Sequence, residues 1–173
     1  MKIILYIATS LDGFIARKNG SVDWLSEFSN SEEDYGYKEF LDSVGIVVLG
    51  NTTYKEFKAP YEGKKCFVFS RTDKGKRENI TYVNTGVKEF VETLSDDENI
   101  WLVGGADIAK EFLKNNLVDE FIITIIPTIL GEGIPLFAKD YGEHKLKLLN
   151  VKSFDCGVVQ LHYQFNLVRK TSK

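Results

Sequence analysis

Short apolar runs, almost free of polar interruptions, recur along most of the chain. Runs of this length, several of them bounded by Gly or Ser, are typical of strands that are covered on both faces, as in a mainly parallel sheet. A buried helix segment has a similar composition, but the length of the runs favours strands. The pattern therefore predicts strands over residues 3–8, 46–49, 67–69, 100–103 and 121–126.

Helix signals fall between these strands. A Ser-x-x-Asp segment at residues 31–34 resembles a capping box, and a Thr-x-x-Glu segment at residues 53–56 is a second one, which opens a short helix that must end before Pro60. Apolar residues recur at helical spacing in residues 87–94 and 106–117. Strands that alternate with helices predict an α/β fold.

The end of the chain has a different pattern. Residues 147–154 and 158–167 flank an Asp-Cys-Gly turn, and apolar residues alternate in the second segment, which predicts an antiparallel hairpin. The expected architecture is a sandwich of helices around a mixed, mainly parallel sheet that ends in this hairpin. No internal repeat or linker is visible, so we expect a single domain over residues 1–173.

Composition and charge exclude several classes of function. Acidic residues outnumber basic ones, 25 to 22, so no basic excess favours a nucleic-acid partner. Two cysteines, Cys66 and Cys156, are too few for a disulfide framework, and neither they nor His144 and His162 have the spacing of metal ligands, so no metal is expected. The first apolar run is too short for a secretory signal, and no run is long enough to span a membrane. A cytoplasmic protein is the expectation.

Glycines and polar residues follow three of the predicted buried strands directly, at residues 50–53, 70–72 and 104–108. Glycine lets a ligand approach the backbone, free N–H groups at a helix start favour phosphate, and the Arg71 guanidinium suits a phosphate ester. Each segment also has a purely structural interpretation, as a tight turn, a helix cap or a solvated loop. Because ligands of open α/β sheets bind outside the carboxyl ends of strands, the three together predict a dinucleotide site.

The order of these motifs resembles the dihydrofolate reductase superfamily, and most closely the branch that contains the reductase domain of the bifunctional riboflavin deaminase-reductase. The resemblance extends over residues 2–167. It rests on Ala-Thr-Ser-Leu-Asp-Gly-Phe-Ile-Ala at 8–16, Leu-Gly-Asn-Thr-Thr-Tyr at 49–54, Trp-Leu-Val-Gly-Gly-Ala at 101–106, and an Asp-Glu…Pro…Gly-x-Gly-x-Pro-Leu-Phe pattern at 119–137. It implies a dihydrofolate reductase-like, three-layer αβα sandwich.

The resemblance also implies NADPH as the cofactor. In the family, the backbone at positions matching Ala8 and Ile15 holds the nicotinamide carboxamide, and positions matching Ser70 and Arg71 meet the adenosine 2′-phosphate. The Gly-Gly bond is expected to be cis. The other implied cofactor residues surround the pyrophosphate or form the Gly-Gly turn: Gly50, Asn51, Thr52, Thr53, Gly104, Gly105, Ala106, Asp107 and Ile108. Asn51 replaces a usual Arg or Lys, which leaves the preference for NADPH over NADH to Arg71.

Fewer residues point to the substrate. Asp34 matches the helix carboxylate that fixes the pterin ring in dihydrofolate reductases and is the candidate catalytic residue; alternatively, it is an ordinary acid in the first turn of a helix. Asp12, Trp24 and Thr124 are candidate substrate-binding residues, with a turn, core packing and strand propensity as the alternative roles. Lys64 stands where dihydrofolate reductases carry an Arg for the glutamate carboxylate, which argues against dihydrofolate as substrate.

The sequence thus predicts an NADPH-dependent oxidoreductase resembling 5-amino-6-(5-phosphoribosylamino)uracil reductase, with hydride transfer to a pyrimidine or pteridine-like substrate. The zinc motifs of the deaminase half, His-x-Glu and Pro-Cys-x-x-Cys, are absent from the chain. Dihydrofolate reductase activity and a catalytically silent nucleotide-binding domain are the alternatives. The apolar residues of segment 121–137 and of the hairpin exceed what one edge strand needs, and they predict a symmetric homodimer.

Overall fold

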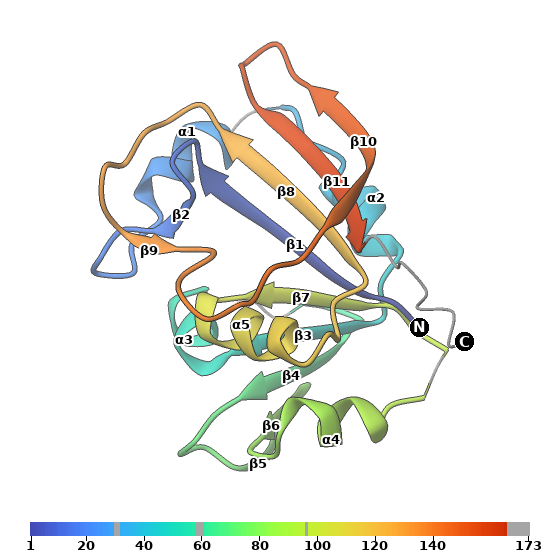
Figure 1. The fold of residues 1–173 in the computed structure, drawn as a ribbon. Coiled ribbons are helices and arrows are strands. Elements are labelled where there is room, and N and C mark those ends of the chain that lie inside the picture. The colour runs from blue at the N-terminus through green and yellow to red at the C-terminus, as the bar shows by residue number, and fades with distance from the viewer. Residues whose placement is uncertain (30–31, 58–60, 96, 166–173) are drawn as a thin grey trace.

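The structure is a computed structural model that describes residues 1–29, 32–57, 61–95 and 97–165 (Figure 1). The strands are β1 (Ile3–Ser10), β2 (Phe14–Ala16), β3 (Ile46–Gly50), β4 (Lys65–Phe69), β5 (Gly75–Arg77), β6 (Ile80–Val83), β7 (Ile100–Gly104), β8 (Glu120–Ile126), β9 (Ile134–Pro135), β10 (Leu146–Ser153) and β11 (Val159–Phe165). The helices are the 3-10 turn η1 (Asp23–Leu25), α1 (Ser26–Ser29), α2 (Tyr37–Asp42), α3 (Asn51–Phe57), α4 (Val87–Glu92) and α5 (Ala106–Lys114).

Nine strands form one sheet in the order β10-β11-β8-β1-β7-β3-β4-β6-β5. The six strands from β8 to β6 are parallel, whereas β11, β10 and β5 run antiparallel to their neighbours. The short strands β2 and β9 pair separately. The predicted mixed, mainly parallel sheet with a C-terminal antiparallel hairpin is therefore confirmed.

Helices cover both faces of the sheet. On one face, Phe90 of α4 and Phe112 of α5 pack against Leu5 and Val48. On the other face, Phe40 of α2 packs with Val47 and Trp101, and α3 contributes Tyr54. The result is the three-layer αβα sandwich that the resemblance implied.

The helix starts differ from the sequence prediction. Helix α2 begins at Tyr37, directly after Gly36 in the left-handed region, and not at the capping box of residues 31–34. Ser31 lies outside the described residues. Helix α3 begins at Asn51, before the predicted Thr53 cap, and the Thr53 hydroxyl accepts a hydrogen bond from the N–H of Gly105.

The position of β8 also corrects the sequence analysis, which placed its residues near a sheet edge. Strand β8 lies between β1 and β11, so Phe121 and Ile126 are buried within the molecule. The edge strand on this side of the sheet is β10, and all eight of its residues are exposed. Within the described part of the chain, the helices are too short or too polar to cross a bilayer.

Candidate functional site

Four neighbouring parallel strands, β1, β7, β3 and β4, end at the same edge of the sheet (Figure 1). Helix α3 follows β3 without a break, and α5 begins one residue after β7, so both helices start at this edge. The three polar segments that the sequence singled out therefore lie side by side. The three segments follow strands that are distant in sequence but adjacent in the sheet, which is the arrangement of a dinucleotide site.

The Gly104-Gly105 turn lies at the centre of this edge, and its peptide bond is cis, as the resemblance implied. The N–H of Gly105 donates to Thr53 Oγ1 over 2.8 Å, which joins the end of β7 to the first turn of α3. A Cβ on Gly105 would lie 3.1 Å from that hydroxyl oxygen and 3.9 Å from the side chain of Ile15. The glycine thus keeps open a cradle between Thr53 and Ile15.

The N-terminus of α5 opens toward the same turn. Its first backbone hydrogen bond runs from the N–H of Ala109 to the carbonyl of Gly105, and no side chain of the described residues caps the helix. The N–H groups of residues 106–108 are therefore available to an anion, and the helix dipole favours one there. The start of this nine-residue helix, together with the open glycine cradle, fits the pyrophosphate of a dinucleotide.

At the end of β4, three side chains form a closed hydrogen-bond cluster. Asn51 Nδ2 donates to Ser70 Oγ (3.1 Å) and to Asp73 Oδ2 (2.7 Å). Ser70 Oγ in turn donates to Asp73 Oδ2 over 3.0 Å. The Ser70 hydroxyl and then the Asn51 amide hold the pKa of Asp73 below its usual value. The cluster occupies the place that the sequence assigned to the adenosine 2′-phosphate.

Asp73 was missed by the sequence analysis. The available signal was an acid two positions after Arg71, in the loop that follows a buried strand. Arg71 itself is exposed beside the cluster. Ser70 and Asn51, both predicted to bind cofactor, are brought together with a carboxylate that the prediction did not include.

At the end of β1, the carboxylate of Asp12 fastens two loops together. It accepts hydrogen bonds from Ser10 Oγ (2.7 Å) and from the N–H groups of Leu130 (3.1 Å) and Gly131 (2.7 Å). The bond from Ser10 is the largest cause of the lowered pKa of Asp12, and the two backbone donors add to it. This geometry gives Asp12 a structural role in ordering the two loops.

Of the predicted substrate residues, Thr124 lies on the sheet face that α2 covers, and Trp24 packs near the end of β8. Thr124 is buried, and its hydroxyl accepts a hydrogen bond from Gln160 Nε2 (3.1 Å), which also approaches the hydroxyl of Tyr6 (3.4 Å). Trp24 is buried against Ile126, and its Nε1–H has no hydrogen-bond partner among the described residues. Tyr6 and Gln160 were not predicted, because a tyrosine and a glutamine in strands give no distinct sequence signal.

Asp34 lies at the start of α2, on the surface. Its carboxylate accepts from the N–H of Gly36 (2.9 Å) and from the N–H of Lys38 (3.3 Å), which is the helix-start role that was its alternative. Burial raises the pKa of the Tyr6 hydroxyl, and the nearby charge of Asp34 adds to the rise.

A cavity of about 220 Å³ opens between α2 and the sheet. Tyr6, Phe40, Ile122, Gln160 and His162 are among the residues that line it. Its mixed polar and aromatic walls suit a planar heterocycle. The described residues contain no group of three or more His, Cys, Asp or Glu side chains that could hold a metal ion.

Comparison with known proteins identifies the relatives of this arrangement. The uncharacterized protein YwjB of Bacillus subtilis (strain 168) is 45% identical over 170 residues, covering 94% of this chain and 97% of the relative. The crystal structure of a putative riboflavin biosynthesis protein from Shewanella sp. PV-4 matches with a TM-score of 0.85 at 28% identity, over 95% of this chain and 99% of that one.

A more distant likeness shows the fold. Dihydrofolate reductase from Enterococcus faecalis, complexed with NADP(H), matches with a TM-score of 0.70 at 15% identity, over 95% of this chain and 96% of that one. The sequence model of the RibD C-terminal domain matches residues 47–160. The chain belongs to the RibD C-terminal domain family, and its structure has the dihydrofolate reductase-like fold.

Proposed function

We propose that the protein is a nicotinamide-dependent reductase whose substrate is a pyrimidine or pteridine-like ring. The observation that carries the proposal is the open Gly105 cradle at the uncapped start of α5, beside Thr53 and the Asn51–Ser70 pair. The family match and the likeness to a putative riboflavin biosynthesis protein support the same class of reaction. When bound, the reduced dinucleotide would supply the hydride.

The chain's own residues would hold and orient the two reactants. The first N–H groups of α5 would bind the pyrophosphate, and the backbone at Ala8 and Ile15 would fix the nicotinamide at the end of β1. The substrate ring would lie under α2, against Thr124 and Gln160. The two proposed binding surfaces would then lie next to each other, because Ala8 and Thr124 are register partners in β1 and β8.

Two side chains on the substrate side would orient the substrate ring. The raised pKa of Tyr6 keeps its hydroxyl protonated at neutral pH, so that it can donate a hydrogen bond to a ring nitrogen or carbonyl. Asp34 would orient the ring from the start of α2. The resemblance points to a ribosylamino-pyrimidine phosphate, which we propose as the substrate. It also points to NADPH as the donor, whereas the proposal for this chain is the broader class of reduced nicotinamide dinucleotides.

The experiment has a binding stage and a turnover stage. NADH and NADPH are titrated by calorimetry, and then oxidation of each is followed with ribosylamino-pyrimidine phosphates, pterins and dihydrofolate. We expect micromolar binding and oxidation with at least one pyrimidine or pterin. Absence of binding by both dinucleotides at millimolar concentration would contradict the proposal. Binding without oxidation across the panel would favour the silent nucleotide-binding domain instead.

A further inference from the structure

The loop after β4 places a carboxylate where the adenosine ribose of a bound dinucleotide would lie. We propose that Asp73 makes this site selective for a ribose with a free 2′-hydroxyl, so that the protein binds NADH in preference to NADPH. The inference rests on the dinucleotide binding proposed above and specifies which dinucleotide binds. It reverses the preference that the resemblance implied.

The hydrogen bonds that Asp73 accepts are concentrated on one of its two carboxylate oxygens. Oδ2 accepts from three side chains, those of Asn51, Ser70 and Thr72, at 2.7, 3.0 and 3.2 Å. Oδ1 accepts no hydrogen bond within the described ranges. The Asp73 side chain is 29% exposed, so its carboxylate is accessible to solvent. A carboxylate oxygen in such a position accepts strongly from a sugar hydroxyl.

The hydrogen-bond donors of Asn51 and Ser70 are already used within the cluster. Both hydrogens of the Asn51 amide point to Ser70 and Asp73, and the single Ser70 hydroxyl hydrogen points to Asp73. Asn51 Oδ1 is buried and has no hydrogen-bond partner in the described part of the chain. The unused capacity of this cluster is therefore for accepting. A ribose hydroxyl can donate, whereas an ionised phosphate ester only accepts.

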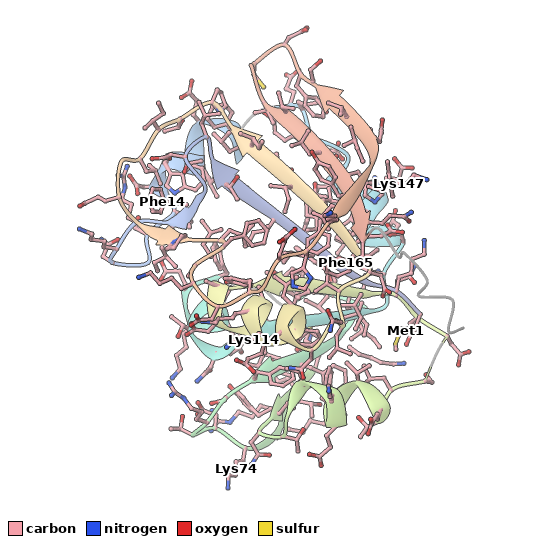
Figure 2. All side chains as sticks on the ribbon, in the orientation of Figure 1. Met1, Phe14, Lys74, Lys114, Lys147 and Phe165 are labelled. Carbon is pink, nitrogen blue, oxygen red and sulfur yellow. The ribbon has the colours of Figure 1, made fainter. Side chains whose placement is uncertain are left out.

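The negative charge of Asp73 also opposes a 2′-phosphate at this position. A 2′-phosphate within hydrogen-bond distance of Ser70 would lie close to the Asp73 carboxylate, and the lowered pKa keeps that carboxylate ionised at neutral pH. Lys55 Nζ lies 3.9 Å from Asp73 Oδ2, so its charge is directed at the carboxylate. Lys74, the next residue along, extends away from the lower end of the molecule in Figure 2. Arg71 remains as an exposed cation that could meet a phosphate once the carboxylate is removed.

The competing interpretation is that Asp73 only closes its loop. Asp73→Asn separates the two roles, because the amide oxygen still accepts from Asn51 and Ser70 while the charge is lost. Asp73→Ser is the second variant, in case the Asn side chain disturbs the loop. Glu92→Gln, which removes one exposed acidic charge at the end of α4, is the matched control.

The test measures dissociation constants by calorimetry for NADH and NADPH, and for the fragments ADP and adenosine 2′,5′-bisphosphate, on each protein after thermal unfolding has shown that it is folded. We expect the wild type to bind NADH about tenfold or more tightly than NADPH, and the Asp73 variants to lose most of this ratio through tighter NADPH binding. Glu92→Gln should keep the wild-type ratio. In the Asp73→Asn background, Arg71→Ala should then weaken NADPH far more than NADH.

A wild type that binds NADPH as tightly as NADH, or more tightly, overturns the inference, and so does an unchanged ratio in both Asp73 variants. These results leave the proposed reductase standing. Failure of the wild type to bind either dinucleotide is a different result, which overturns the proposed function and this inference together.

Discussion

The two halves of the sheet place their functional residues in different ways. The parallel strands β1, β7, β3 and β4 are covered on both faces by helices, and Val47, Val48 and Leu102 have no exposed surface. The antiparallel hairpin of β10 and β11 ends in a strand on which Leu148 is 47% and Val151 is 49% exposed. Strands that are buried on both faces can present polar groups only at their ends, so the candidate cofactor residues gather at one edge.

The antiparallel half instead presents polar groups on a face. Gln160 pairs with Thr124 and His162 pairs with Ile122, so these residues of β11 and β8 point to the α2 side of the sheet. The candidate substrate wall is therefore a strand face, whereas the candidate cofactor site is a row of strand ends. Because the two sites use different strands, mutations should separate them.

The largest effect is expected from filling the cradle in the parallel half. In Gly105→Ala, the added Cβ would lie 3.1 Å from Thr53 Oγ1, at the place where the backbone is proposed to meet the pyrophosphate. We expect dinucleotide binding to weaken about 100-fold, measured by calorimetry, with a loss of stability of only ~1 kcal/mol. Gly86→Ala, before α4, is the control, because its Cβ would meet no atom within 4 Å. Wild-type dinucleotide affinity in Gly105→Ala would show that the cradle is not part of the binding site.

The second prediction concerns the antiparallel half. We propose that the protein is a homodimer and that β10 forms its interface. Register with β11 puts Leu146, Leu148 and Val151 on one face of β10 and Lys147, Asn150 and Lys152 on the other. An exposed apolar face of this kind, next to a polar one on the same strand, is suited to burial against a second copy.

Sedimentation at micromolar concentration tests this interface. The wild type should sediment as a species of twice 19.7 kDa. Leu148→Lys should shift it toward the monomer by raising the dimer dissociation constant about tenfold or more, without changing cofactor affinity. Asn150→Lys adds the same charge to the opposite face and should leave the dimer intact. A wild type that remains near 19.7 kDa at all concentrations would rule the dimer out.

Most of the sheet could be predicted from the sequence because buried strands have a strong local pattern. The five apolar runs and the hairpin are all present in the structure. The pairs β5–β6 and β2–β9 could not be predicted, because β5 is exposed at all three positions and carries no apolar signal. The order of strands in the sheet is a long-range property, and this is why β8 was wrongly placed near an edge.

The candidate site was partly predictable for a related reason. Glycines such as Gly105 mark a close backbone approach, and this mark is local. The roles of Thr53 and Asp73 depend instead on partners across the sheet edge, Gly105 and Asn51, that are distant in sequence. Local motifs assigned Thr53 to a helix cap and gave no role to Asp73, whereas the fold gives both a hydrogen-bonding partner.

The smallest effect is expected at the link between the two halves, where Asp12 at the end of β1 holds the N–H groups of Leu130 and Gly131 in the loop that follows β8. Asp12→Asn should lower the melting temperature by a few degrees at neutral pH. The hydrogen bond from Ser10 holds the pKa of Asp12 below its usual 3.8, so this stabilisation is present above that value and is lost as the pH falls through the folded-state pKa. The difference in melting temperature between wild type and variant, followed by circular dichroism, should therefore be constant near neutrality and close in acid.

Asp155→Asn, in the exposed hairpin turn, is the control and should show no such closing difference. A gap for Asp12→Asn that persists unchanged at the lowest pH would mean that the carboxylate charge does not fasten the loop.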